Sequence, residues 1–232
     1  MEIEIWSDVV CPWCYVGKRN FETALARFEH RDEVTVRWRS FELDPSAPTE
    51  RTGRYTVHLA RKYGMSEAQA QRSIDTMTET GARAGVVLDF ERARPGNTFD
   101  AHRLLHLAVG HGRQDALKER LFRATFTDGE PIGDRATLGR LAAEVGLPAG
   151  EVAAALDDGA YADDVRADEE LAMELGISAV PYFVIDRKFG IPGAQPPDVI
   201  LQVLNRAWAK LQPVTPAGGG AEPACDGDAC PI

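Results

Sequence analysis

The alternation of apolar and polar residues predicts two β-strands near the start of the chain, with a helix between them. Residues 2–6 alternate with a period of two, and residues 34–38 repeat that period. Between these segments, from about Pro12 to Glu29, the apolar residues follow helical spacing instead. A strand, a helix and a second strand in this order predict a parallel βαβ unit with a right-handed crossover.

The long middle part of the chain has helical periodicity almost throughout, from about residue 55 to 175. Ser66, Asp115 and Asp134 stand where helix N-caps are expected. Strand character returns in residues 180–186, and one more helix follows. We therefore expect an α/β fold in which one open sheet is divided in the sequence by a large, all-helical insertion.

Composition and charge narrow the classes of partner. The chain has 232 residues, 44% of them hydrophobic, and a formal net charge of −10. This charge argues against nucleic acid or an anionic membrane as a partner, because both bind basic surfaces. No apolar run approaches the roughly 20 residues that a bilayer demands. The acidic, alternating start of the sequence is unlike a signal peptide, so we expect a cytoplasmic protein, monomer or homodimer.

The four cysteines form two close pairs, Cys11 with Cys14 and Cys225 with Cys230. In a reducing compartment such pairs indicate redox chemistry or metal binding. Cys11 precedes the first predicted helix, where free backbone N–H groups and the helix dipole stabilise a thiolate. Cys14 lies one turn inside, close enough to attack a mixed disulfide on Cys11. We therefore predict a thioredoxin-like site with Cys11 as nucleophile and Cys14 as resolving thiol.

Two more positions are candidates for contact with a substrate. Trp13 lies between the two cysteines and is expected to be exposed, whereas Trp6 and Trp38 are expected in or near the core. Pro181 opens a predicted strand and lacks the N–H that an ordinary sheet ladder needs.

Five ordered motifs together resemble the DsbA family of thiol–disulfide oxidoreductases, in particular its FrnE-like branch. They are SDVVCPWCYVG, NTFDAHRLLHLA, FTDGEPIGD, ISAVPYFVID and FGIPGAQPPDVI, and the resemblance covers about residues 1–211. It implies a thioredoxin fold with an inserted helical domain, and a cis bond between Val180 and Pro181 in a loop that positions substrate. It also implies protein or small-molecule substrates with thiols or disulfides, and no organic cofactor. Secreted DsbA proteins carry a signal peptide, and this sequence shows none.

The expected domain organisation follows from this order. Residues 1–50 form the first part of the thioredoxin-like domain, residues 51–165 the inserted helical domain, and residues 166–212 the second part. Residues 213–232 are rich in Pro, Gly and Ala and are expected to form a flexible tail. The tail carries Cys225 and Cys230, a CxxxxC pair that some FrnE-like proteins share. This pair is expected to exchange with the main dithiol as an accessory redox pair, the alternative being a dispensable tail.

Two other functions remain open from the sequence. The 2-hydroxychromene-2-carboxylate isomerases and kappa-class glutathione transferases have a related fold, and they usually have serine at the position of Cys11. Glutathione is therefore a candidate reductant or co-substrate. Alternatively, all four cysteines could bind zinc, although structural zinc usually holds together domains that lack their own core.

One further pattern could be mistaken for a metal site. His102 and His106 are four residues apart on a predicted helix, but Arg103 stands where a metalloprotease has glutamate. We expect both histidines at a helix surface or a domain seam, and no metal site. Asn97 is expected to cap the same helix, with a glutathione or substrate contact as the alternative.

Overall fold

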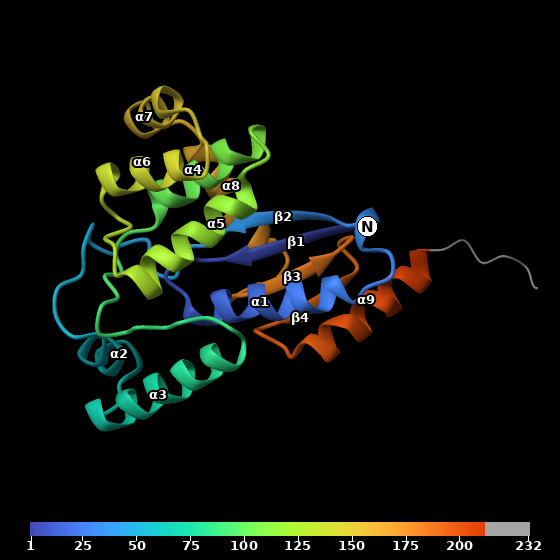
Figure 1. Ribbon diagram of the computed structural model, residues 1–232, viewed down its shortest axis with the longest axis horizontal. Helices are drawn as coiled ribbons and strands as arrows, with labels where there is room; N and C mark the ends of the chain where they lie inside the picture. The colour runs from blue at the N-terminus through green and yellow to red at the C-terminus, as the bar shows by residue number, and fades with distance from the viewer. Residues whose placement is uncertain (212–232) are drawn as a thin grey trace, which may run out of the picture.

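The computed structural model describes residues 1–211, in which a four-stranded sheet carries helices on both faces (Figure 1). The strands are β1 Glu2–Ser7, β2 Thr35–Ser40, β3 Tyr182–Ile185 and β4 Phe189–Pro192. They lie in the order β2-β1-β3-β4; β2 is parallel to β1, β3 antiparallel to β1, and β4 antiparallel to β3. The predicted α/β fold, its parallel βαβ unit and the division of its sheet by a helical insertion are confirmed.

The helices fall into those that flank the sheet and those of the insertion. The first set is α1 Pro12–Ala26, α8 Ala162–Glu174 and α9 Pro197–Leu211. The second is α2 Tyr55–Tyr63, α3 Glu67–Arg83, α4 Phe99–Gly110, α5 Gln114–Arg123, α6 Arg135–Glu144 and α7 Ala149–Asp157. None of the helices in residues 1–211 combines the length and apolar character that a membrane crossing requires.

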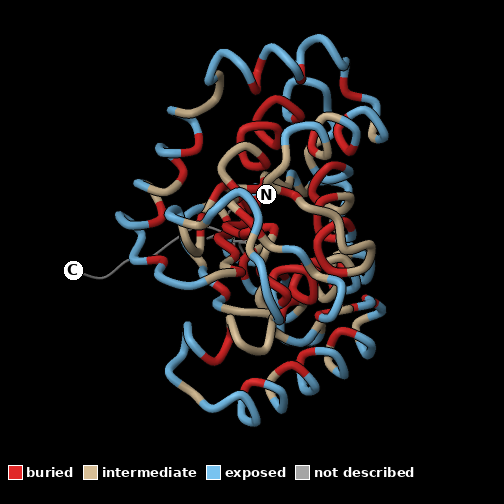
Figure 2. Tube along the Cα trace, turned by 90° about the vertical axis from the view of Figure 1, so that its left-hand side faces the viewer, coloured by how far each residue is buried: buried red, intermediate tan, exposed pale blue. Residues whose placement is uncertain are grey.

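The two faces of the sheet pack against different helices because side chains alternate along β1. Ile3 and Ile5 face a core shared with α1 and α9. Trp6 points the other way, packs against residues of α8, and donates its indole N–H to the carbonyl oxygen of Asp168 at 2.9 Å. Trp6 and Trp38 are both buried, as predicted. Figure 2 shows the buried residues concentrated in the interior, with exposed residues on the outer faces of the helices.

Most of the predicted helix ends are close to the observed ones. The Ser66 side chain caps α3 in a capping box with Gln69, and Asp134 caps α6 by accepting from the backbone N–H of Thr137 at 2.8 Å. The prediction of Asp115 as a cap is wrong. Helix α5 begins at Gln114, and the Asp115 carboxylate instead accepts from the indole N–H of Trp38 at 2.9 Å.

One of the expected domain limits falls inside a helix of the described residues. Helix α8 runs across residue 165, where we expected the insertion to end. The expected tail, residues 213–232 with Cys225 and Cys230, lies outside the described residues.

A buried network of charges joins the sheet to the insertion. Arg39 of β2 donates to Glu4 of β1 at 2.9 Å and to Asp168 of α8 at 2.7 Å, and all three side chains are almost completely buried. His106 of α4 lies 3.1 Å from the same Asp168 carboxylate. Burial would raise the pKa of Asp168, but His106, the backbone N–H of Ser40 and Arg39 together hold it below its usual value. The network ties α4 and α8 to the sheet.

We predict that Arg39→Leu lowers the free energy of unfolding by about 3 kcal/mol, because it removes the cation that the buried Glu4 and Asp168 share. Glu4 then keeps only Arg187 as a partner, and Asp168 keeps only His106. Urea denaturation followed by circular dichroism measures the change. Arg27→Leu is the matched control, since Arg27 pairs with Asp198 at the exposed surface and should cost less than about 1 kcal/mol. Equal losses in the two variants would contradict the role assigned to the buried network.

Candidate active site

The turn between β1 and α1 places Cys11 at the helix N-terminus. Cys11 is the N-cap residue, with extended backbone angles of φ −98° and ψ 111°, and Pro12 occupies the first turn, where its missing N–H is tolerated. The backbone N–H of Cys11 donates to the carbonyl oxygen of Asp8 at 3.1 Å, and the Cys11 carbonyl accepts from the N–H of Cys14 at 3.0 Å. The N-terminal end of α1 therefore faces the Cys11 sulfur with its positive dipole end.

The two cysteines are free thiols with different surroundings. Cys11 is 4% exposed and lines a pocket, whereas Cys14 is 1% exposed and lies beneath it. Burial raises the pKa of Cys14 well above its usual range, and the neighbouring Cys11 raises it further. Cys14 therefore keeps its proton at neutral pH, and Cys11 is the thiol that an incoming disulfide can reach. The roles of Cys11 as nucleophile and Cys14 as resolving thiol stay predictions.

The loop before β3 approaches Cys11 from the opposite end of the chain. The peptide bond between Val180 and Pro181 is cis. The Cys11 thiol donates to the carbonyl oxygen of Val180 at a sulfur–oxygen distance of 3.6 Å. Gly17 of α1 leaves room for the Pro181 ring, because a Cβ atom at Gly17 would lie 2.8 Å from the Pro181 Cγ. Helix α1 and the Val180–Pro181 loop thus pack directly against each other at the dithiol.

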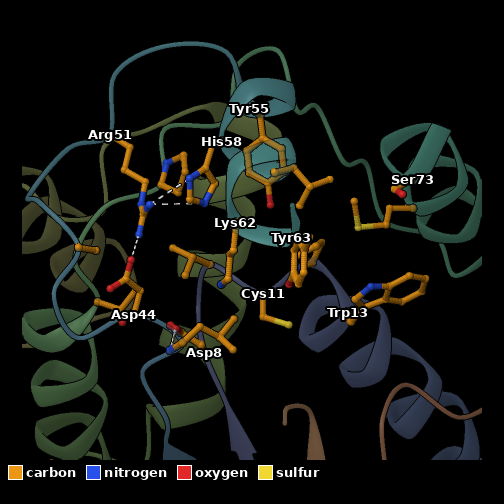
Figure 3. Close-up of a pocket in the computed structure, with 18 of the residues that line it drawn as sticks. Asp8, Cys11, Trp13, Asp44, Arg51, Tyr55, His58, Lys62, Tyr63 and Ser73 are labelled. Atoms are coloured by element: carbon orange, nitrogen blue, oxygen red, sulfur yellow. Dashed lines mark hydrogen bonds and ion pairs between the residues drawn. The ribbon is translucent and has the colours of Figure 1, made fainter. Parts of the chain in front are cut away.

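A pocket of about 400 Å³ opens beside Cys11, between the sheet domain and the first helices of the insertion. Figure 3 shows Cys11 and Trp13 on one side of this pocket and the side chains of α2 on the other. Trp13 is 39% exposed, as predicted for a residue that contacts substrate, and Tyr63 is exposed across from it. The lining is mostly apolar, with residues of α3 and of the loops around Leu43 and Pro95 closing the sides.

Charged side chains gather on the wall formed by α2 and the loop before it. Arg51 forms an ion pair with Asp44 and lies 3.0 Å from Nδ1 of His58 (Figure 3). Burial, Arg51 and Lys62 lower the pKa of His58, so this imidazole is neutral at pH 7. Lys62 has no ion pair among the described residues, and its ammonium lies 5.8 Å from the centre of the Tyr63 ring. The wall across from Cys11 therefore presents two cations, one of them uncompensated.

Asp8 is the site residue that the sequence analysis missed. It is fully buried, lines the pocket beside Cys11, and accepts from the backbone N–H of Leu43 at 2.8 Å. Its other oxygen lies 3.4 Å from Nε2 of His102. Burial acts to raise the pKa of Asp8, but His102, the Leu43 amide and Lys118 together hold it below its usual value. Asp8 therefore stays ionised next to the dithiol.

The two histidines have structural partners. His102 faces Asp8 and His106 faces Asp168, and both imidazoles are buried at the seam between α4 and the sheet domain. They are not at a helix surface. No cluster of three or more potential metal ligands occurs within residues 1–211. The N-cap of α4 is Thr98, so the prediction of Asn97 as the cap is off by one residue. The Asn97 side-chain oxygen nevertheless accepts from the N–H of Phe99, the first residue of the helix, at 3.0 Å.

The structure brings most of the predicted site residues together. Cys11, Cys14, Trp13, Val180 and Pro181 meet around the N-terminus of α1. Cys225 and Cys230 lie outside the described residues, so the accessory redox role stays a prediction.

Comparison with known proteins identifies the family. The model of the DSBA-like thioredoxin domain matches residues 2–205. The chain belongs to the DsbA-like thioredoxin family. It is 34% identical over 207 residues to the uncharacterized protein YwbO of Bacillus subtilis (strain 168), covering 88% of this chain and 96% of YwbO. The resemblance seen in the sequence motifs is thereby confirmed at the level of the DsbA-like family.

Solved structures support the same family and fold. The probable DsbA oxidoreductase SCO1869 from Streptomyces coelicolor is 46% identical and superimposes with a TM-score of 0.87, covering 100% of this chain and 99% of that one. The cytosolic disulfide reductase DsbM from Pseudomonas aeruginosa, solved with glutathione, superimposes with a TM-score of 0.61 at 19% identity. That comparison covers 90% of this chain and 100% of DsbM, and it shows a shared fold. The predicted thioredoxin fold with a helical insertion is confirmed.

We predict that Gly17→Ala slows disulfide exchange about 10-fold, because the added methyl group displaces the Pro181 ring and with it the Val180 carbonyl beside Cys11. The overpacking should also cost about 1–3 kcal/mol of stability. Gly139→Ala in α6 is the control, since an added Cβ there meets nothing within 4 Å. It should leave exchange unchanged. Turnover of a disulfide substrate measures both, and full activity in Gly17→Ala would refute the close packing of this loop on α1.

Proposed function

We propose that this protein is a thiol–disulfide oxidoreductase that uses Cys11 and Cys14 as its dithiol. The observation that carries the proposal is the position of Cys11 at the N-terminus of α1, facing a pocket, with the buried Cys14 one turn inside. Family membership supports the same chemistry. Thiol–disulfide exchange needs no organic cofactor, and we propose that none takes part.

The exchange proceeds in two displacements. The Cys11 thiolate forms a bond to one sulfur of the substrate disulfide, and the other substrate sulfur leaves as a thiolate that takes a proton from water. Cys14 then loses its proton and bonds to Cys11, which releases the second substrate sulfur. The substrate gains two electrons and the dithiol becomes a disulfide. In the opposite direction the same steps oxidise a substrate dithiol.

The surroundings of Cys11 supply the contacts for a substrate. Trp13 and Tyr63 offer exposed aromatic surface on both sides of the pocket mouth. The Val180–Pro181 loop lies against Cys11, where we propose that it holds the polypeptide or small molecule that carries the reacting sulfur. The substrates are protein or small-molecule disulfides, and we assign the chain to the FrnE-like branch.

A glutathione-linked reaction is the second candidate, and the pocket is the observation that favours it. Its volume of about 400 Å³ suits a small thiol, and Arg51 and Lys62 on its wall can bind carboxylates. We propose that glutathione serves as reductant or co-substrate in the cytoplasm, as the cytosolic location and bound glutathione of DsbM suggest. An isomerase or transferase of the 2-hydroxychromene-2-carboxylate isomerase or kappa type would use the same pocket and tolerate the loss of Cys14.

We predict that the protein catalyses insulin disulfide reduction by dithiothreitol and that Cys11→Ser reduces the rate to the uncatalysed level, because no nucleophile remains. Cys14→Ser should accumulate a mixed disulfide on Cys11, seen as a mass increase, because the resolving thiol is missing. Replacing Cys225 and Cys230 by serine should lower the rate only in part.

The same assay separates the competing functions. Activity that needs added glutathione and survives Cys14→Ser would favour the isomerase or transferase. An inactive wild-type protein that retains stoichiometric zinc would favour the zinc-binding module, and the proposed function would be abandoned.

A further inference from the structure

A lysine of the helical insertion reaches the end of β1, next to the turn that carries the dithiol. Lys118 belongs to α5 and is 0% exposed. Its only polar contact among the described residues is to the carbonyl oxygen of Ser7, at 3.2 Å. No carboxylate within residues 1–211 forms an ion pair with it. Burying an ammonium group without an ion pair lowers the stability of the fold. This cost points to a functional reason for this lysine.

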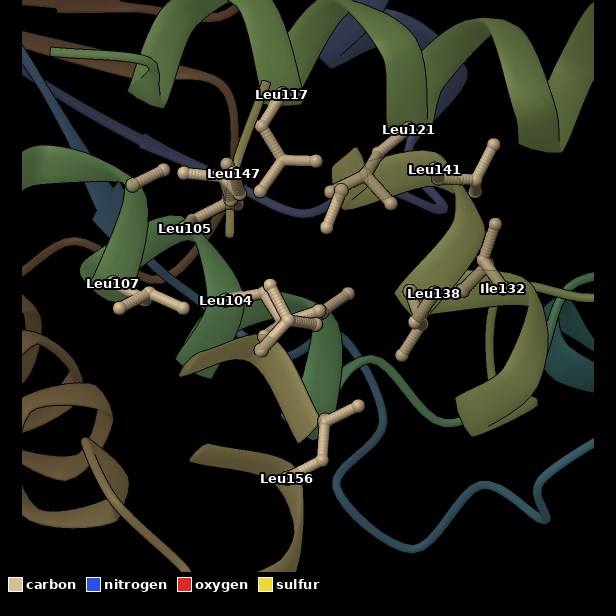
Figure 4. Close-up of a cluster of buried hydrophobic side chains, with 14 of the residues drawn as sticks. Leu104, Leu105, Leu107, Leu117, Leu121, Ile132, Leu138, Leu141, Leu147 and Leu156 are labelled. Carbon is tan, nitrogen blue, oxygen red and sulfur yellow. The ribbon is translucent and has the colours of Figure 1, made fainter. Parts of the chain in front are cut away.

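Helix α5 holds this lysine in a fixed place. Leu117 and Leu121 anchor α5 in the core of the helical insertion (Figure 4). The same helix packs against β2, and the Lys118 ammonium lies 5.6 Å from the centre of the Trp38 ring and 5.2 Å from that of Phe122. The two aromatic rings and the Ser7 carbonyl surround the ammonium and keep it out of contact with solvent.

The groups that face Lys118 come from three elements. Cys11 and Cys14 lie at the start of α1, Lys18 lies further along it, and Asp8 lies in the turn after β1, where it is paired with His102 of α4. Burial lowers the pKa of Lys118 to about 8, and the charges of Cys14, Asp8 and Cys11 oppose this lowering. In turn, Lys118 acts to lower the pKa of Cys14 against the larger effect of burial. The lysine and the resolving thiol thus stabilise each other's charged forms.

Lys18 is a second buried lysine near the site, and it differs from Lys118 in having ion pairs. It is also almost completely buried, but it forms ion pairs with Glu22, Asp115 and Glu119. Lys118 differs in that the groups that face it include the two thiols. Its charge is compensated best when one of the cysteines is a thiolate.

We propose that Lys118 is a positioning residue for the dithiol, whose ammonium group stabilises the thiolate that Cys14 must form to resolve a mixed disulfide on Cys11. This inference rests on the proposed function. In the step concerned, Cys14 releases its proton to solvent, and its sulfur forms a bond to the Cys11 sulfur. The bond between Cys11 and the substrate breaks, and the substrate sulfur leaves with the electron pair and takes a proton from water. Lys118 transfers no proton to the reacting sulfurs in this step.

The charge of Lys118 also affects the equilibrium between the dithiol and disulfide forms of Cys11 and Cys14. A disulfide carries no charge, so only the reduced protein can add a thiolate to the negative charge of Asp8 that acts on the ammonium. Lys118 therefore favours the reduced form and raises the reduction potential. Since the reduced form also holds the Lys118 proton more tightly, reduction takes up a further fraction of a proton near pH 8. The potential of the wild-type dithiol should then fall more steeply with pH than that of a variant without the lysine.

The test uses the full chain with Cys225 and Cys230 replaced by serine, so that one dithiol titrates in dithiothreitol redox buffers. Lys118→Met should make reduction about 10-fold less favourable, which is about 30 mV for a two-electron couple. Lys118→Gln, which keeps a donor for the Ser7 carbonyl but no charge, should shift the potential in the same direction. Both variants should lose the steeper pH dependence near pH 8. Lys18→Met is the control and should change the equilibrium less than about twofold.

Stability and redox readouts separate the outcomes. Because Lys118 has no ion pair, Lys118→Met should resist urea as well as the parent or better. The inference would be overturned if both variants kept a redox equilibrium constant within twofold of the parent's. Lower stability in Lys118→Met, with the stability restored in Lys118→Gln, would then make the lysine a purely structural hydrogen-bond donor. A parent protein that forms no Cys11–Cys14 couple would overturn the proposed function instead.

Discussion

The site depends on the conformation of the turn between β1 and α1, and the contacts of the buried Asp8 fix that conformation. Its carbonyl accepts from the N–H of Cys11, and its carboxylate accepts from the N–H of Leu43 and faces His102. One buried residue thus joins the turn that carries the nucleophile to the connection after β2 and to α4 of the insertion. The turn and the connection after β2 also line the pocket beside Cys11, together with α2 and α3.

The insertion contributes more than a cover over the site. Helix α2 supplies the wall across from Cys11, α4 supplies the partner of Asp8, and α5 places Lys118 at the Ser7 carbonyl, next to the turn that carries the dithiol. The seam between insertion and sheet is unusually rich in buried charge, since the Arg39 network lies along it as well. Buried charges of this kind add little stability compared with apolar packing. Of these buried charges, Lys118 acts on the Cys14 thiol, and the Arg39 network holds α4 and α8 against the sheet.

The local features of the site could be predicted from the sequence, and the long-range ones could not. The CxxC spacing after an alternating strand is enough to place Cys11 at a helix N-terminus and Cys14 one turn inside. By contrast, Lys118 and Ser7 are 111 residues apart, and no local pattern marks this lysine as buried. The sequence position of Asp115 fits a helix cap, but its carboxylate accepts from the indole N–H of Trp38, 77 residues away in the sequence.

The most direct test of the account is the redox state of the Cys11–Cys14 pair. Trypsin releases both cysteines on the peptide 1–18, which has no Lys or Arg before Lys18, and it separates them from Cys225 and Cys230 after Lys210. Mass spectrometry of this peptide after equilibration in dithiothreitol redox buffers would follow the loss of two hydrogens. The account predicts a reversible conversion of Cys11 and Cys14 between dithiol and disulfide with a single two-electron midpoint. A peptide 1–18 that stays fully reduced under oxidising buffers would contradict it.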